Sequence, residues 1–403
     1  MKTRSVKPLP AWLPIVILVV VLMVAAGYAL YFNKINKKRV VNLYLAKANS
    51  SKLHDEYGLA TDALQQAISL DPQNIQAQTE QLKIKILKIA QENDSLNQLL
   101  NLEKIDEAEA SCKKLLAADP QSAELTALLG IVYAQKDRPE LAIQTYQKAS
   151  ELNPGSPNIQ NYWGYTMVQW QFPADWKTLA TQKFNKAKEL DPTYVNPHIN
   201  LAKLALNDGK FDDAISILKQ AEEIGRKNEI LYTLWGSVLD QSGEQIEARD
   251  KIAANQKFSE ALERYRIAET LNPKLLLAHY NRARTLGALQ SYDAAIAEYE
   301  KALELEPSFV LAHVGLAIVL YERNAQSTDL QEALNHLNQA MSFTDQTIQQ
   351  YQERKGRTTD AHARTKLDEW TGNRKDNKNY FGIIIQAVKA KQSGKRDSNT
   401  PNN

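Results

Sequence analysis

Three histidines recur at equivalent places along the chain, and histidine is the side chain best suited to bind a metal ion or move a proton near neutral pH. His198, His279 and His313 stand in the segments NPHINLA, LAHYNRA and LAHVGLA. Because each segment holds the same place in a repeated pattern, the three rings are expected one repeat apart, too far to share a metal ion. We therefore predict packed rings, each with one satisfied nitrogen.

Other patterns that carry catalytic chemistry are absent from the sequence. It contains no Gly-rich phosphate loop, no HExxH and no GxSxG. Cys112 is the only cysteine, which excludes an intramolecular disulfide and cysteine-based zinc sites. It stands where a large apolar residue is expected, so we predict a buried, inert thiol. The prediction is that the chain is not an enzyme and uses no cofactor, metal ion or small-molecule substrate.

Charge is distributed unevenly along the chain, although the net charge is only +2. Residues 1–45 contain seven basic and no acidic side chains, and residues 346–403 contain 12 basic and 6 acidic ones. The body between them is therefore acidic. This distribution argues against a nucleic-acid groove along the body, since such grooves are basic.

Residues 11–32 contain no charged side chain over 22 positions. As a helix they would be roughly 30 Å long, about the thickness of a bilayer's hydrocarbon core. Trp12 at one end and Tyr31 at the other fit an interfacial aromatic belt. We predict a transmembrane anchor within residues 1–40. A signal peptide cleaved after residues 24–26 (Val-Ala-Ala) is the alternative.

The predicted localisation is therefore a single-pass membrane protein. The short flanks on both sides of the span are basic, so the positive-inside rule does not decide which side the body occupies. The non-cytosolic side of a bacterial envelope is slightly preferred.

From about residue 41 the sequence repeats an ending in which an Ala-containing amphipathic helix is followed by an acidic residue or Asn and then Pro. Proline lacks an N–H and fixes φ, so it ends one helix and starts the next pair. Pro120 to Pro154 and Pro273 to Pro307 are each 34 residues apart. The six occurrences are AISLDP (67–72), LLAADP (115–120), ASELNP (149–154), AKELDP (187–192), AETLNP (268–273) and ALELEP (302–307).

Within these units the spacing of small and large residues resembles the tetratricopeptide repeat (TPR) family. One unit shows Leu129, Gly130 and Tyr133 on its first helix and closes with Ala142 and Tyr146. Two further units are opened by Trp235 with Gly236 and by His279 with Ala283. The resemblance implies an all-α, right-handed α-solenoid of about eight TPR-like helix pairs, preceded by the one transmembrane helix, and small residues that let paired helices approach closely.

We predict the array over residues 41–345, with long inserts near 83–105 and 240–258. Residues 346–392 are predicted to be a helical cap, or alternatively a Lys-rich amphipathic helix on an anionic membrane. The polar residues 393–403 are predicted to be a disordered tail.

Candidate partner-binding residues follow from the same resemblance, because the first helix of each TPR pair lines the concave groove. Asn200 with Lys203 and Asn281 with Arg284 recur there, and amides can bind the backbone of an extended peptide. The aromatic residues Tyr162, Tyr165 and Trp170 gather in the fourth unit, roughly residues 157–194, where exposed rings would mark a binding hot spot. The alternatives are solvated polar residues and core aromatics.

The sequence thus predicts a membrane-anchored scaffold or adaptor that binds proteins or peptides in its groove, for assembly of a membrane or envelope complex. The alternative is a receptor that hands chaperone-bound or nascent clients to a translocation machine. That alternative requires a Lys/Asn/Arg clamp for a C-terminal carboxylate, and no consecutive units carry it.

Overall fold

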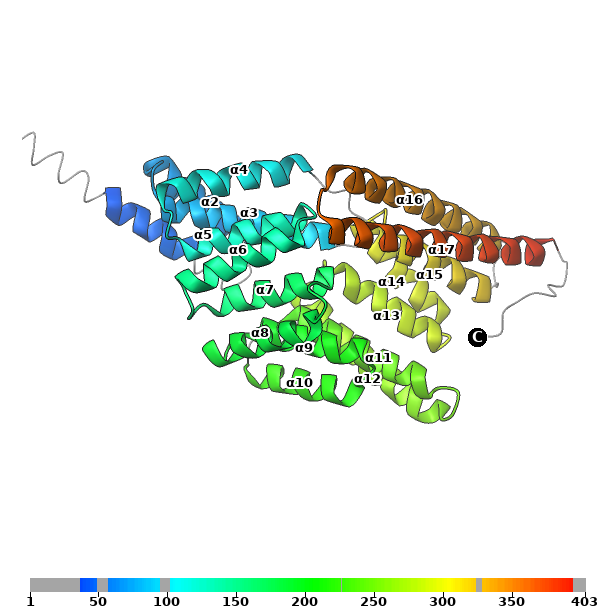
Figure 1. Ribbon diagram of the computed structural model, residues 1–403. Coiled ribbons are helices and arrows are strands. Elements are labelled where there is room, and N and C mark those ends of the chain that lie inside the picture. Colours follow the sequence, from blue (N-terminus) through cyan, green and yellow to red (C-terminus); the bar gives the residue numbers. More distant parts are fainter. Residues whose placement is uncertain (1–36, 49–56, 95–101, 226, 324–327, 394–403) are drawn as a thin grey trace, which may run out of the picture. The chain divides into compact units, whose positions relative to one another are not determined.

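The protein is described by a computed structural model over residues 37–48, 57–94, 102–225, 227–323 and 328–393. Every regular element in these ranges is an α-helix (Figure 1), which confirms the all-helical prediction. A first helix covers residues 37–48. The others are α2 (Tyr57–Leu70), α3 (Ile75–Asp94), α4 (Leu102–Ala118), α5 (Ala123–Gln135), α6 (Pro139–Leu152), α7 (Pro157–Trp170), α8 (Trp176–Leu190), α9 (Val195–Asn207), α10 (Phe211–Glu223), α11 (Glu229–Ile246), α12 (Lys251–Leu271), α13 (Leu276–Ala288), α14 (Tyr292–Leu305), α15 (Val310–Arg323), α16 (Asp329–Arg357) and α17 (Ala361–Gln392).

Contacts divide the chain into two compact units. The first unit is Met1–Leu87 with Ala117–Pro120. Its described core joins the helix of residues 37–48, α2 and the start of α3 through buried side chains that include Val41 and Leu64. Asn74 begins α3, because its side-chain oxygen accepts the N–H of Ala77 at 2.9 Å and so caps the helix.

The second unit comprises Lys88–Leu116 and Gln121–Asn403. From α5 onward its helices form successive antiparallel pairs: α5/α6, α7/α8, α9/α10, α11/α12, α13/α14 and α15/α16. Each second helix also packs against the first helix of the following pair. The first helices of neighbouring pairs are in contact as well, for example α9 with α11 and α11 with α13.

The Asp/Asn/Glu-Pro steps end the second helices as the sequence predicts. Asn153, Asp191, Asn272 and Glu306 each precede a proline and share φ between −143° and −141° with ψ between 87° and 96°. Proline sterically excludes the helical conformation from the residue before it, which forces this extended backbone. Each of the four N–H groups still bonds to the carbonyl four residues earlier, as Asn153 does to Ala149 at 3.0 Å. The backbone therefore turns in the same way after α6, α8, α12 and α14.

Close packing within a pair depends on a small residue that faces an aromatic ring. A Cβ added to Gly130 on α5 would lie 2.7 Å from the ring of Tyr146 on α6, and one on Gly164 would lie 2.8 Å from the ring of Phe184. Both rings are fully buried. The predicted role of Gly130 in bringing the paired helices together is confirmed by this contact.

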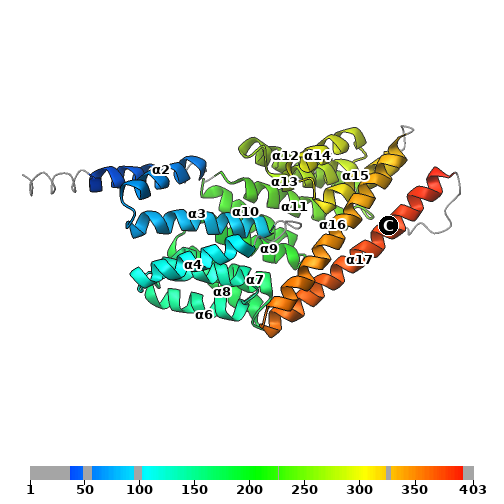
Figure 2. The same cartoon turned by 90° about the horizontal axis from the view of Figure 1, so that it is seen from above.

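Six helices, α3, α4, α11, α12, α16 and α17, have 17 or more residues, whereas the others from α2 to α15 have 13 to 15. The extra residues near 240–258 lengthen α11 to 18 and α12 to 21 residues. At the C-terminus α16 has 29 residues and α17 has 32. These two lie side by side in both views (Figures 1 and 2). The boundary predicted at residue 345 falls inside α16, because the first glycine of this helix is Gly356 and it contains no proline.

The predicted single-pass membrane location is contradicted. Over the ranges that the structure describes, no helix combines the length and the apolar character needed to cross a membrane. The residues to which the anchor was assigned, 11–32, lie outside the described residues, as do the signal-peptide alternative at 24–26 and all of the predicted tail except Ser393. The correction therefore rests on the helices that are described.

Candidate functional site

The first helices of three neighbouring pairs each leave one stripe accessible to solvent. On α9 the stripe is Asn196, Asn200, Lys203 and Asn207, with the spacing of one helical face. The equivalent residues on α13 are Leu277, Asn281, Arg284 and Ala288. Between them, α11 contributes Ile230, Ser237 and Gln241. We call these eleven residues the free face because they are accessible to solvent; several of them also bond to neighbouring side chains.

Four predicted site residues therefore lie on one surface, at equivalent positions of α9 and α13. Lys203 is exposed, and Asn200, Asn281 and Arg284 are half-buried. The structure does not bring the Asn200–Lys203 pair next to the Asn281–Arg284 pair, because α11 lies between them. Their role in binding a partner stays a prediction.

Asn200 and Arg284 are already held by neighbouring helices. The amide of Asn200 donates to Asn161 Oδ1 on α7 at 3.0 Å. Arg284 forms an ion pair with buried Asp240 on α11 and lies 3.6 Å from Glu244. These contacts orient both side chains, and sequence reasoning missed them because the partners come from different repeats.

The three predicted aromatic residues share helix α7, but only two are accessible. Tyr162 and Tyr165 are half-buried, whereas Trp170 is 1% exposed. The ring of Trp170 lies 5.2 Å from that of Trp370 on α17. The hot spot predicted at Trp170 is thus occupied by the chain's own C-terminal helix.

The recurrent histidines are buried, and two of them use one ring nitrogen in the same way. His279 and His313 each place Nε2 at 2.9 Å from the carbonyl oxygen of the proline six residues earlier. His198 instead places Nδ1 at 3.3 Å from the carbonyl of Tyr194. The prediction of packed rings with a satisfied nitrogen is confirmed. The partner of the second nitrogen differs between the histidines. In His313 it is His336, with 2.9 Å between the two Nδ1 atoms.

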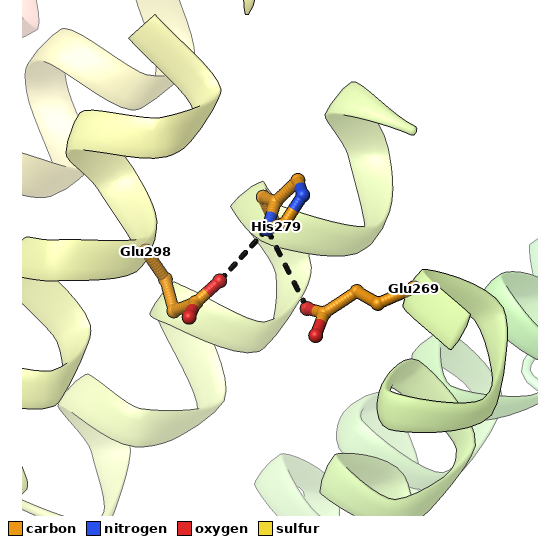
Figure 3. Close-up of side chains that lie close together, drawn as sticks. All are labelled: Glu269, His279 and Glu298. Atoms are coloured by element: carbon orange, nitrogen blue, oxygen red, sulfur yellow. Dashed lines mark hydrogen bonds and ion pairs between the residues drawn. The ribbon is translucent and has the colours of Figure 1, made fainter. Parts of the chain in front are cut away.

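His279 belongs to a cluster of charged residues from three helices (Figure 3). Its Nδ1 lies 2.8 Å from Glu298 on α14 and 3.6 Å from Glu269 on α12. Arg282 bridges both carboxylates at 2.7 and 3.2 Å, and Lys301 approaches Glu298 at 2.8 Å. The cluster therefore joins the pair α11/α12 to the pair α13/α14.

The same cluster contains ligand atoms suited to a divalent metal ion. One atom each from Glu269, His279 and Glu298 lies within 4.8 Å of the others, and such O and N donors bind zinc. However, Arg282 and Lys301 already place two cations on the two carboxylates. Both nitrogens of His279 face oxygen acceptors, which is the pattern of a protonated imidazolium. The donor set fits a protonated histidine better than a metal ion.

The charges in the cluster shift the pKa values of its members. The hydrogen bond to Glu298 raises the pKa of His279 against the effect of burial. Burial alone would raise the pKa of Glu298, but hydrogen bonds from His279 and Lys301 and the charge of Arg282 lower it to about 2. The network therefore holds α12, α13 and α14 together through ion pairs between neighbouring repeats.

Comparisons with known proteins support the TPR family. The model for the "Tetratricopeptide repeat" matches residues 99–161, and a "TPR repeat" model matches residues 284–323. The TPR repeat-containing protein YpiA of Bacillus subtilis (strain 168) is 28% identical over 127 residues. That match covers 30% of this chain and 29% of the relative.

Solved structures show the same fold. The anaphase-promoting-complex heterotetramer Cut9–Hcn1 superposes with a TM-score of 0.58 at 17% identity, over 86% of this chain and 58% of that one. A human IFIT1 dimer with m7Gppp-AAAA gives a TM-score of 0.53 at 15% identity, over 85% and 79% of the two chains. The fold is that of a TPR-like solenoid, which is typical of protein-binding scaffolds, and no catalytic family is indicated.

Proposed function

We propose that this protein is a scaffold that binds a segment of another protein along the free face of α9, α11 and α13. The observation that carries the proposal is the alignment of accessible side chains at one register on three adjacent helices. Solenoids bind over broad surfaces of this kind, with the energy spread over several repeats.

The chemistry of the free face favours an extended peptide with an apolar anchor. Ile230 is 42% exposed and Leu277 is 45% exposed, and they occupy equivalent positions on neighbouring helices. The amides of Asn200 and Asn281 lie one helical turn further along α9 and α13, and they can pair with a peptide backbone. An apolar side chain would rest between Ile230 and Leu277 while the amides hold the adjoining main chain.

An array that fixes such a surface can bring several proteins together. Each of the three helix pairs that form the free face adds its own accessible stripe, so different segments of this face can hold different partners. The role proposed for the protein is therefore assembly of a multiprotein complex through the free face.

The test compares two full-length variants that carry the same kind of change at different places. In one, Ile230→Asp and Leu277→Asp are combined on the free face. The control is Ile252→Asp on α12, a residue that is 85% exposed and outside the free face. Partners from extracts of the source organism are cross-linked to each chain and quantified by mass spectrometry.

We expect the free-face variant to lose the partners that the wild type and the control retain, with an unchanged thermal midpoint. Combined Asn200→Ala and Asn281→Ala should weaken the same partners, because both amides would lose their backbone contacts. If the same partners remain bound to the free-face variant, binding occurs elsewhere and the proposal is wrong.

A further inference from the structure

The C-terminal hairpin of α16 and α17 touches its own array far back along the chain. Its tip, residues 351–370, lies beside the end of α7 in both views (Figures 1 and 2). At the turn after α5, Arg354 forms an ion pair with Asp137, with Nε at 3.1 Å from Oδ2. The hydroxyl of Thr358 donates to the carbonyl of Asp137 at 2.8 Å. These residues are more than 200 positions apart in sequence.

A second set of contacts joins the tip to the turn after α7. His362 donates from Nε2 to the carbonyl of Trp170 at 2.7 Å, and its ring lies 4.8 Å from that of Phe172. Lys366 donates to the side chain of Gln171 at 2.6 Å. Beside them the rings of Trp170 and Trp370 meet at 5.2 Å. We call the turns after α5 and α7 the docking turns.

The tip and the base of the hairpin are held by different kinds of contact. At the base, Phe381 is buried with Val314, and Val388 is buried with Leu320, in two apolar clusters. At the tip, one ion pair, three hydrogen bonds and two ring contacts join side chains of α16 and α17 to side chains and carbonyls of the docking turns. Contacts that depend on a few polar groups open more readily than apolar helix packing. The tip can therefore separate while the base stays in place.

One polar atom beneath the tip is left without a partner. Trp170 is 1% exposed, and its Nε1 has no hydrogen-bond acceptor in the part of the chain that the structure describes. A buried donor without an acceptor costs free energy, because it loses its hydrogen bond to water and gains none in return. The tip thus leaves one hydrogen bond of this surface unmade. A ligand with an oxygen that accepts the Nε1–H of Trp170 would bind there more tightly.

We propose that the docking turns form a protein-binding site and that the hairpin tip occupies it in cis as a releasable ligand. The tip links the pair α15/α16 to the pairs of α5 and α7. Its release would therefore let the helix pairs between them move relative to one another. Release also uncovers Trp170 for a partner segment that supplies a basic side chain for Asp137. This inference does not rest on the free face, which is a separate surface.

Hydrogen exchange of the full chain tests the proposal. In the wild type we expect amides of the tip to exchange at least tenfold faster than amides of the base, residues 378–391. Arg354→Ala should speed exchange at least a further tenfold in the tip and in the docking turns together. The base should be unchanged. Coupled change at both sides of the contact distinguishes release from fraying of the hairpin alone.

A matched control lies one turn along the same helix. Arg357 is 60% exposed and pairs only weakly with Glu353 at 3.9 Å, so Arg357→Ala should leave exchange unchanged. Lys366→Ala is a milder second variant, at the docking turn after α7. It should speed hydrogen exchange of the same peptides, and it provides the test if Arg354→Ala does not fold.

Three outcomes would overturn the proposal. Tip and base could exchange at one common rate, which would make the hairpin a permanent part of the fold. Lys366→Ala could speed the base as much as the tip. Light scattering could show a dimer with a protected tip, which would mean that the tip docks on a second copy. None of these measurements involves a partner protein. A result that overturns this inference therefore leaves the proposed binding at the free face untouched.

Discussion

Replacing Gly130 by alanine tests whether a glycine–ring contact sets the distance between paired helices. The new Cβ would lie 2.7 Å from Cε1 of Tyr146 and 3.0 Å from two further ring atoms. Carbon atoms prefer about 3.5 Å or more, so the ring or the helix must move by about 0.8 Å. Neither has free space, because Tyr146 is fully buried and α5 is buried on nearly all sides.

The expected cost follows from two opposing effects. Overpacking of a filled core costs about 1–3 kcal/mol. Alanine is favoured over glycine within a helix by about 1 kcal/mol, which offsets part of that cost. Gly130→Ala should therefore destabilise the protein by up to about 2 kcal/mol, measured by urea unfolding followed by circular dichroism.

The matched control is Gly372→Ala on α17. A Cβ there would meet nothing within 4 Å, so only the helix preference acts and the variant should gain about 0.5–1 kcal/mol. A double variant with Tyr146→Leu should lose most of the Gly130→Ala penalty, because the ring atoms that clash are gone. If Gly130→Ala is as stabilising as Gly372→Ala, the contact with Tyr146 does not limit the approach of α5 and α6.

Four further predictions concern titratable groups. Glu298, with a pKa near 2 instead of 4.5, should contribute about 3 kcal/mol above pH 4.5 that is lost as pH falls toward 2; Glu298→Gln should flatten this part of the stability–pH profile. The raised pKa of His279 predicts a contribution to stability that is present below pH 6.5 and is lost as pH rises through the raised pKa, and His279→Gln should remove that slope. Burial and His313 lower the pKa of His336 to about 4, so acidification from pH 6.5 to 4 should destabilise the wild type more than His336→Leu. Burial, with Glu109, raises the pKa of the Cys112 thiol to about 12, so a thiol reagent at pH 8 should react only after unfolding.

Local signals in the sequence predicted the helices and their ends well. Proline after Asn153 or Asp191 dictates the backbone of the preceding residue, whatever packs around it. The small residue at Gly130 and the ring at Tyr146 also lie within one unit of the repeat. Such features depend on residues close in sequence, which a repeated pattern displays several times over.

Contacts between repeats were not predictable in the same way. Glu269 and Glu298 meet His279 from the preceding and the following helix, and the distance between those helices depends on how the pairs stack. Asn200 was predicted as a peptide ligand, yet its amide also holds Asn161, 39 positions earlier. A polar residue on a first helix can serve either purpose, and its sequence context is the same for both.

The docking of the hairpin tip marks the limit of reasoning from a repeat pattern. In a solenoid each unit contacts only its neighbours, so the pattern carries no information about contacts between distant units. Arg354 and Asp137 belong to no repeated motif, and each would pass as a solvated charge. Asp360, whose side chain caps α17 by accepting the N–H of Ala363 at 2.9 Å, does signal the turn between α16 and α17. That signal places a hairpin at the C-terminus, but the length of its two helices decides how far back along the array it reaches.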